Sequence, residues 1–443
     1  MRIRVLSVLS ILAIGVTTLS LIRGQERPAP VPVAPDSPPR ETPPPAASSP
    51  VVPLPAATTP AALTQGPARD FSKLDEFPKE MLASCQRGAD WLARHNDTKG
   101  HFLPGYLPAL NKPIEGENYL NQAGAAFALA RAARFLGKDL YAARAAQTIL
   151  KLLDETVVDA DKWNRRHTSL PSTVLNRLGT SALLVLAIHE LPSPQPDLLD
   201  KAEQMCNWIR GQARTDGSLR CLDGDDDAVD DPDCVNEYPG LALYAVLRSQ
   251  THRPAEWKNE LARKAVGYYR NWWKTHRSME FVPWQTAAFA EAYVRTKDKA
   301  FAEFVFDMND WLCGLQYDTF DSQRLLWFGG FMKWADGKSI DAMPTIHSSQ
   351  YTESLAEARR AARTAADVDR YQRYSDVLQH GLQFLVRLQY ANANTQHFEE
   401  WYRPRLVGGF HASLQDGSLR LEHAQHALSA LVTYLEDSVV GSQ

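Results

Sequence analysis

The residues best suited to chemistry lie where loops lead into apolar helical segments. Glu237 and Tyr238 are an example, because they follow Asn236 and precede Pro239-Gly240 and an apolar run. This pattern predicts a helix start, with Asn236 as the N-cap and the proline near the first turn, where its missing N–H is tolerated. A carboxylate at that end is favoured by the helix dipole. Glu237 is therefore a candidate for acid–base chemistry.

The same layout recurs along the chain and collects the residue types of a sugar pocket. Aromatic rings stack on sugar faces, amides read hydroxyl groups, and paired carboxylates supply an acid and a base. The candidates for proton transfer are Glu237, Tyr238, Glu353, Glu422 and His426. The candidates for substrate binding are Asn118, Gln122, Trp284, Gln285, Gln350, Tyr351, His423, Trp327 and Trp401.

Helix capping is the alternative explanation for such residues, because polar side chains gather at helix N-termini in any protein. It accounts poorly for Gln122, Gln285, Gln350 and His426, which fall inside otherwise apolar helical segments. A buried amide or imidazole needs hydrogen-bond partners, and a cavity supplies water or a ligand. We therefore expect these four side chains to face a cavity.

An acidic loop with seven aspartates lies between Cys221 and Cys234. Asp223, Asp225 and Asp227 alternate as calcium ligands do, but the glycine and closing glutamate of an EF-hand are missing. The loop is alternatively a solvated run of charge. Calcium is the one cofactor that the sequence suggests.

Two further patterns favour other chemistry. Asp223, Asp225 and Asp226 resemble the DxDD motif of class II terpene cyclases, which would make Asp225 the central acid. The histidines His423 and His426 are spaced to share a metal ion with a neighbouring carboxylate or histidine, although no fuller motif surrounds them. Both alternatives stay open.

The N-terminus predicts export. Arg2 and Arg4 precede an uncharged run that ends at Arg23, and this run is at the short limit for a spanning helix. Residues 1–24 are therefore a cleaved signal peptide or a signal anchor, and only this segment is expected to touch a membrane. In the periplasm or outside the cell, Cys221 and Cys234 would form a disulfide.

A Pro-rich linker over residues 25–70 follows, and it holds fourteen of the 28 prolines. Such a composition has no face that could pack, so we expect an extended spacer. The net charge of -4 and a pI of 6.3, with no basic tract, exclude a nucleic-acid partner. We expect a monomer that binds poly- or oligosaccharide.

Twelve helical segments are expected after about residue 74, at residues 78–95, 118–136, 140–156, 171–190, 196–213, 238–251, 255–276, 284–296, 299–316, 348–366, 369–390 and 421–437. Helices of one type share a similar C-terminal sequence with an aromatic, an aliphatic and a basic residue or glutamine, as in DWLARH, NWIRGQ, NWWKTH, DWLCGLQ and QFLVRLQ. The other type is rich in Ala, Gly and Leu, which predicts burial on all sides. Short strands are expected only in loops.

Alternation of six outer and six inner helices predicts units that bury their faces against neighbours and close into a ring. The fold class is therefore all-α, an (α/α)6 toroid of six helical hairpins over residues 71–440. In this repeat, and in its W-L/I…Q endings, the chain resembles the α/α-toroid group of six-hairpin glycosidases, uronate lyases and terpenoid-cyclase-like proteins. The resemblance covers about residues 74–440.

In a closed ring of hairpins the inner helices all begin at one end, which we call the mouth. The aromatic, glycine-rich loops at residues 318–345 and 391–419 should hang over it. The resemblance implies a carbohydrate-active hydrolase, lyase or epimerase at this mouth. A non-catalytic envelope scaffold and a terpenoid-cyclase-like enzyme are the alternatives. An enzyme should show titratable groups with opposed pKa shifts at the mouth.

Overall fold

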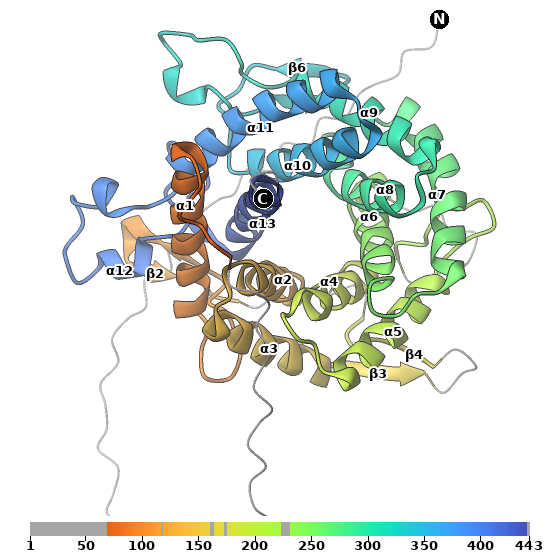
Figure 1. The fold of residues 1–443 in the computed structure, drawn as a ribbon. Coiled ribbons are helices and arrows are strands. Elements are labelled where there is room, and N and C mark those ends of the chain that lie inside the picture. The colour runs from red at the N-terminus through yellow and green to blue at the C-terminus, as the bar shows by residue number, and fades with distance from the viewer. Residues whose placement is uncertain (1–68, 117, 160–163, 172–174, 223–230, 441–443) are drawn as a thin grey trace, which may run out of the picture. The chain divides into compact units, whose positions relative to one another are not determined.

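The computed structural model describes residues 69–116, 118–159, 164–171, 175–222 and 231–440. Within this part of the chain, an inner layer of helices surrounds an axis and an outer layer surrounds the inner one (Figure 1). The inner helices are α2 (Tyr119–Leu136), α4 (Arg177–Glu190), α6 (Pro232–Ser249), α8 (Val282–Thr296), α10 (Ser348–Ala365) and α13 (Leu421–Val440). The outer helices are α1 (Glu76–Arg94), α3 (Asp139–Asp154), α5 (Pro196–Arg210), α7 (Glu256–Thr275), α9 (Lys299–Cys313) and α11 (Val368–Arg387).

The ring closes through its inner helices, because α2 packs on both α4 and α13, the first and last neighbours in the chain. Small residues allow this close approach. Gly124 of α2 lies so near α13 that an added Cβ would overlap the side chain of Gln425. The inner helices are buried almost all round, from Ala123 to Ala133 in α2 and from Leu178 to Glu190 in α4. The predicted (α/α)6 toroid is confirmed.

All twelve predicted helices are present in the described residues, but α4 and α6 begin elsewhere. The helix α4 starts at Arg177 rather than at residue 171. The helix α6 starts at Pro232 rather than at residue 238, and the side chain of its N-cap, Asp231, accepts a hydrogen bond from the N–H of Asp233. The prediction of Asn236 as N-cap is therefore wrong. An N-cap aspartate followed by proline is the stronger start signal, and the acidic run hid it.

Four outer helices are followed by the same kind of turn, which accounts for their shared sequence endings. In each loop a glycine with positive φ packs against the backbone of a neighbouring outer helix, as Gly100 on Gln147, Gly217 on Lys264, Gly329 on His380 and Gly408 on Arg87. The glutamine that follows α9 and α11 fixes this turn through side-chain hydrogen bonds. The Nε2 of Gln389 donates to the carbonyl oxygens of Ser84 and Gly408, at 3.0 and 3.1 Å. The Nε2 of Gln316 donates in the same way to Gly329 and Val377.

Strands are short and lie in loops, as predicted. They are β1 (Gly105–Leu107), β2 (Lys112–Pro113), β3 (Thr156–Asp159), β4 (Arg165–Thr168), β5 (Lys333–Ala335), β6 (Lys338–Ile340) and β7 (Leu419–Arg420). All pairs are antiparallel, and β1 joins β2 to β7. The short helix α12 (Arg403–Leu406) lies in the loop before α13. Among the described residues no helix is long and apolar enough to span a membrane.

Several predictions fall on other parts of the chain. The signal segment 1–24 and most of the linker 25–70 lie outside the described residues, as do the calcium candidates Asp223, Asp225 and Asp227. The structure forms no disulfide among the cysteines of its described residues, so the Cys221–Cys234 bond stays a prediction.

Candidate functional site

Charged groups at the starts of four inner helices act on one another, which places these starts around the predicted mouth. The charge of His426, in α13, acts on Glu237 of α6 and on His347, just before α10. Glu280, just before α8, acts on the same two residues. The sequence analysis missed Glu280, although the rule that selected the others, a carboxylate that leads into an inner helix, also fits it.

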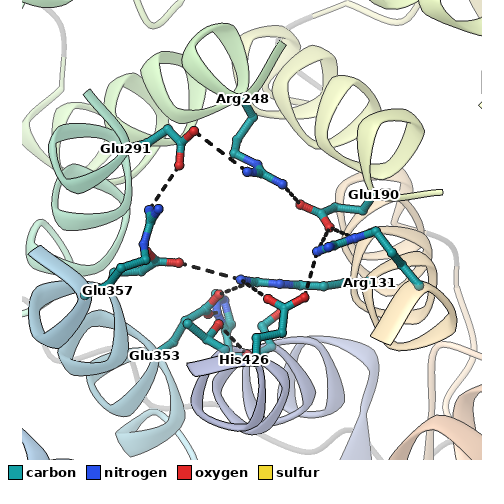
Figure 2. A network of polar contacts seen from close by, with 12 residues as sticks. Arg131, Glu190, Arg248, Glu291, Glu353, Glu357 and His426 are labelled. Carbon is teal, nitrogen blue, oxygen red and sulfur yellow. Dashed lines mark hydrogen bonds and ion pairs between the residues drawn. The ribbon is translucent and has the colours of Figure 1, made fainter. Parts of the chain in front are cut away.

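The centre of the mouth is a buried pair of side chains from α10 and α13. Nδ1 of His426 lies 3.1 Å from Oε2 of Glu353, and each residue is 7% exposed. The other carboxylate oxygen lies 3.6 Å from Nη1 of Arg131, on α2. A carboxylate can only accept a hydrogen bond, so His426 donates to Glu353 through Nδ1. Its Nε2 then carries a lone pair and can act as a base. Figure 2 shows the contacts that join His426, Glu353 and Arg131.

Glu237 is the residue of the mouth suited to donate a proton, because the pKa of its carboxyl group is raised. Burial among protein atoms raises the pKa of its carboxyl group, the charge of His426 and a hydrogen bond with Tyr238 oppose that rise, and Glu280 adds to it. The residue as a whole is nevertheless exposed to solvent. Glu237 therefore holds its proton to a higher pH than an ordinary carboxyl group, which suits an acid.

The other two histidines of the mouth are held neutral. The pKa of His423 is lowered to about 4, mainly by burial and in smaller part by the charges of His347 and Arg420. Burial also lowers the pKa of His347, and the charge of His426 adds to the effect. Both imidazoles are therefore uncharged near pH 7 and can exchange hydrogen bonds with hydroxyl groups. Burial therefore raises the pKa of Glu237 and lowers the pKa of His347 and His423, and each shift favours the neutral form of its group.

Aromatic residues line the same place. The ring centroid of Trp284 lies 5.6 Å from that of His426, and Trp284 is 7% exposed. Tyr351 packs edge-on against Phe331 at 5.4 Å, which brings the loop before α10 to the mouth. Burial raises the pKa of both Tyr238 and Tyr351, so each hydroxyl keeps its proton.

Asn118 and Gln122, two candidates for substrate binding, have structural roles in the fold. Asn118 caps α2, and its side-chain oxygen accepts from the N–H groups of Leu120 and Asn121. The amide of Gln122 bonds both backbone groups of Phe102, at 2.8 and 2.7 Å, and so fixes the loop after α1.

Glu422 accepts a hydrogen bond at 2.9 Å from Nδ2 of Asn121, which ties α13 to α2 across the ring seam. It is half-buried, and Arg420 lies 3.9 Å away. This contact gives Glu422 a structural explanation beside its predicted role in proton transfer.

The remaining candidates differ in their burial and in their contacts. Gln285 is fully buried in α8, and neither atom of its amide has a hydrogen-bond partner among the described residues. Gln350 is half-buried in the first turn of α10. Trp327 packs against Tyr317 at 5.4 Å, and Trp401 is 62% exposed. Within the described residues no three His, Cys, Asp or Glu side chains are placed to hold a metal ion.

A second polar cluster lies towards the C-terminal ends of the inner helices, and the sequence analysis missed it. All six inner helices contribute to a closed circuit of arginine and carboxylate side chains (Figure 2). We call this circuit the charged ring. Its contacts are Arg248–Glu190 2.7 Å, Glu190–Arg134 2.6 Å, Arg134–Glu436 3.0 Å, Glu436–Arg131 3.9 Å, Arg131–Glu357 3.6 Å, Glu357–Arg360 2.8 Å, Arg360–Glu291 3.0 Å and Glu291–Arg248 3.8 Å.

The charged ring was visible in the sequence as charges inside segments that otherwise read as apolar, such as the arginines of ALARAAR in α2. Buried charges need partners, so these positions implied contacts between helices. Arg131 belongs both to this ring and to the mouth, since it contacts Glu357 and Glu353.

Solved structures share the fold. A D-mannose isomerase aligns over 82% of this chain and 100% of its own, with a TM-score of 0.58 and 11% identity. The cellobiose 2-epimerase of Bacillus thermoamylovorans gives the same coverage, identity and TM-score. An α-1,6-mannanase of Salegentibacter, in complex with α-1,6-mannotriose, aligns over 82% of this chain and 99% of its own, with a TM-score of 0.54 and 10% identity.

At these identities the likeness establishes the toroid fold alone. No protein-family model matches the chain, and no curated protein matches it.

Proposed function

We propose that the mouth is the active site of a carbohydrate-active enzyme that interconverts sugars by proton transfer, in the manner of an isomerase or epimerase. The observation that carries the proposal is the contact between His426 and Glu353, which leaves Nε2 of His426 as a base. The names of two fold neighbours, an isomerase and an epimerase, agree with it. His426 would remove a proton from a sugar carbon next to a carbonyl group, and Glu237 would supply a proton to an oxygen.

The test measures the incorporation of deuterium from solvent into the sugar. The purified protein is incubated in D2O with a panel of aldoses, ketoses and disaccharides, and carbon-bound deuterium is measured by NMR and mass spectrometry. We expect exchange with one class of sugar, and a loss of about 10²-fold or more in His426→Asn. Glu303→Gln, on the outer face of α9, should exchange like the wild type. No exchange with any sugar, or equal exchange in His426→Asn, would falsify the proposal.

Hydrolysis is the second candidate, because burial raises the pKa of the Glu237 carboxyl group, as it does for the general acid of a glycosidase. In that case the panel would show cleavage of a glycosidic bond without carbon-bound deuterium. Glu237→Gln would then abolish cleavage, whereas in the isomerase proposed it would slow deuterium exchange at the carbon without any cleavage.

We also infer that the protein is exported, with residues 1–24 either cleaved or retained as an anchor. The basic start of the chain and its uncharged run support this inference. Mass spectrometry of the protein from its native host decides cleavage, and alkylation with and without reductant tests the Cys221–Cys234 disulfide. Alkylation of both cysteines without reductant would exclude the bond.

A further inference from the structure

A cavity of about 1040 Å³ lies at the C-terminal ends of the inner helices, and Arg131 is the one residue of the mouth among those that line it. Its lining includes Arg131, Arg248 and Arg360 of the charged ring, and an apolar part of its wall comes from Phe71 and Phe135. Seven of the lining residues are Arg or Lys and five are Asp or Glu. The ends of the inner helices carry partial negative charge, which helps to hold the arginines there.

The deepest arginine has donors that the protein does not use. Arg131 is 4% exposed, and its Nε has no hydrogen-bond acceptor among the described residues. Its Nη1 has only the ion-pair contact with Glu353 at 3.6 Å, which is too long for a hydrogen bond. The Nε of Arg248 also has no acceptor within the described structure. A buried donor without an acceptor is costly, so an occupant with acceptor oxygens is expected.

We propose that this cavity is a second ligand site, distinct from the mouth, which binds the carboxylate or phosphate group of a small molecule through Arg131 and Arg248. The charged ring fixes both guanidinium groups, because Arg248 is held by Glu190 at 2.7 Å and Arg131 lies 3.6 Å from Glu357. Arginine is the side chain best suited to oxyanions, since its N–H groups form a planar fork. Phe71 and Phe135 offer an apolar surface to the rest of the molecule.

The probes are inorganic phosphate and citrate, each titrated by calorimetry at constant ionic strength against sodium chloride. We expect saturable binding of at least one probe. Binding of phosphate alone indicates a phosphorylated ligand, and binding of citrate alone indicates a carboxylate. Saturation by neither probe overturns the proposal.

The variants separate this site from general effects of salt. Arg248→Lys keeps a cation next to Glu190 but removes the Nε donor, and Arg131→Met removes the deepest donors. We expect each to weaken binding at least tenfold. Arg270→Met, on the outer face of α7, removes an exposed ion pair with Glu303 and should bind like the wild type. If Arg131→Met does not fold, Arg248→Lys decides, and unchanged binding in it contradicts the proposal.

Discussion

At the scale of single residues, the mouth depends on the orientation of His426. Glu353 holds Nδ1 of this imidazole at 3.1 Å, and Arg131 holds Glu353 in turn. A hydrogen bond from one ring nitrogen to a carboxylate fixes the tautomer of a catalytic histidine. The sequence could select Glu353 and His426 separately, because each interrupts an apolar helix. It could not pair them, since 73 residues separate them and only the ring closure brings α10 next to α13.

Glu353→Gln tests this orientation without a substrate. An amide can present either its oxygen or its NH₂ group to Nδ1, so we expect His426 to lose its preference for the Nδ1–H tautomer. Long-range ¹H–¹⁵N NMR of the imidazole at pH 8 measures the change. The matched control is Glu303→Gln, which lies on the outer face of α9. An unchanged tautomer in Glu353→Gln would mean that Glu353 does not orient His426.

His189 should make the fold sensitive to acid. It is 5% exposed, its ring stacks on His252 at 5.1 Å, and burial lowers its pKa to about 3, with a further contribution from the charge of His252. The unfolded chain, with a pKa of about 6.5, takes up the proton first as the pH falls. The stability that neutral His189 contributes is therefore complete above pH 6.5 and is lost towards pH 3, at about 1.4 kcal/mol per unit.

His189→Phe keeps an aromatic ring against His252 but cannot titrate. We expect its free energy of unfolding to fall less than that of the wild type between pH 6.5 and pH 4, as measured by urea denaturation. Parallel losses in the two proteins would show that protonation of His189 does not limit acid stability.

At the scale of elements, the repeated turn after the outer helices is the part of the fold that the sequence predicts best. The shared endings identified the helices, and the structure adds that the closing glutamine and the loop glycine serve one junction, as Gln389 and Gly408 do. The start of α6 was predicted less well, because Asp231 is one of seven aspartates between Cys221 and Cys234 and its capping role is not distinctive there.

Gly329→Ala tests this junction. Gly329 has φ +85°, and an added Cβ would overlap the carbonyl oxygen of His380 in α11. Both the left-handed backbone and the overlap with main chain penalise alanine. We expect a loss of about 2 kcal/mol or more of unfolding free energy. In contrast, Gly267 lies on the exposed face of α7 with open space around it. Gly267→Ala should stabilise the protein by about 0.5–1 kcal/mol. Equal effects at the two positions would contradict the role given to Gly329.

At the scale of the whole molecule, charged side chains gather at both ends of the inner layer, and the helix dipoles favour the carboxylates at one end and the arginines at the other. Carboxylates such as Glu237 and Glu422 lie at the N-terminal ends, and arginines such as Arg134 and Arg248 lie towards the C-terminal ends. Sequence reasoning used this rule at the mouth. It did not consider the other end, where arginines and carboxylates together form the ring that joins all six inner helices.

The charged ring should matter to folding more than any surface ion pair does. Glu190 is 1% exposed and accepts from Arg134 and Arg248, at 2.6 and 2.7 Å. Glu190→Gln keeps the shape of the side chain but leaves two guanidinium groups without their shared carboxylate. Removal of one partner from a buried ion pair costs about 3–5 kcal/mol, whereas an exposed pair contributes about 0–1 kcal/mol. Glu303→Gln, which breaks the exposed pair with Arg270, is the control.

Urea denaturation at pH 7 compares the two variants with the wild type. If the charged ring does not stabilise the closed toroid, the urea midpoints of Glu190→Gln and Glu303→Gln should both lie close to that of the wild type. We expect instead that Glu190→Gln alone lowers the midpoint, because α2, α4 and α6 meet at this carboxylate. Without it, Arg134 keeps only its contact with Glu436 at 3.0 Å, and Arg248 keeps only its longer contact with Glu291 at 3.8 Å.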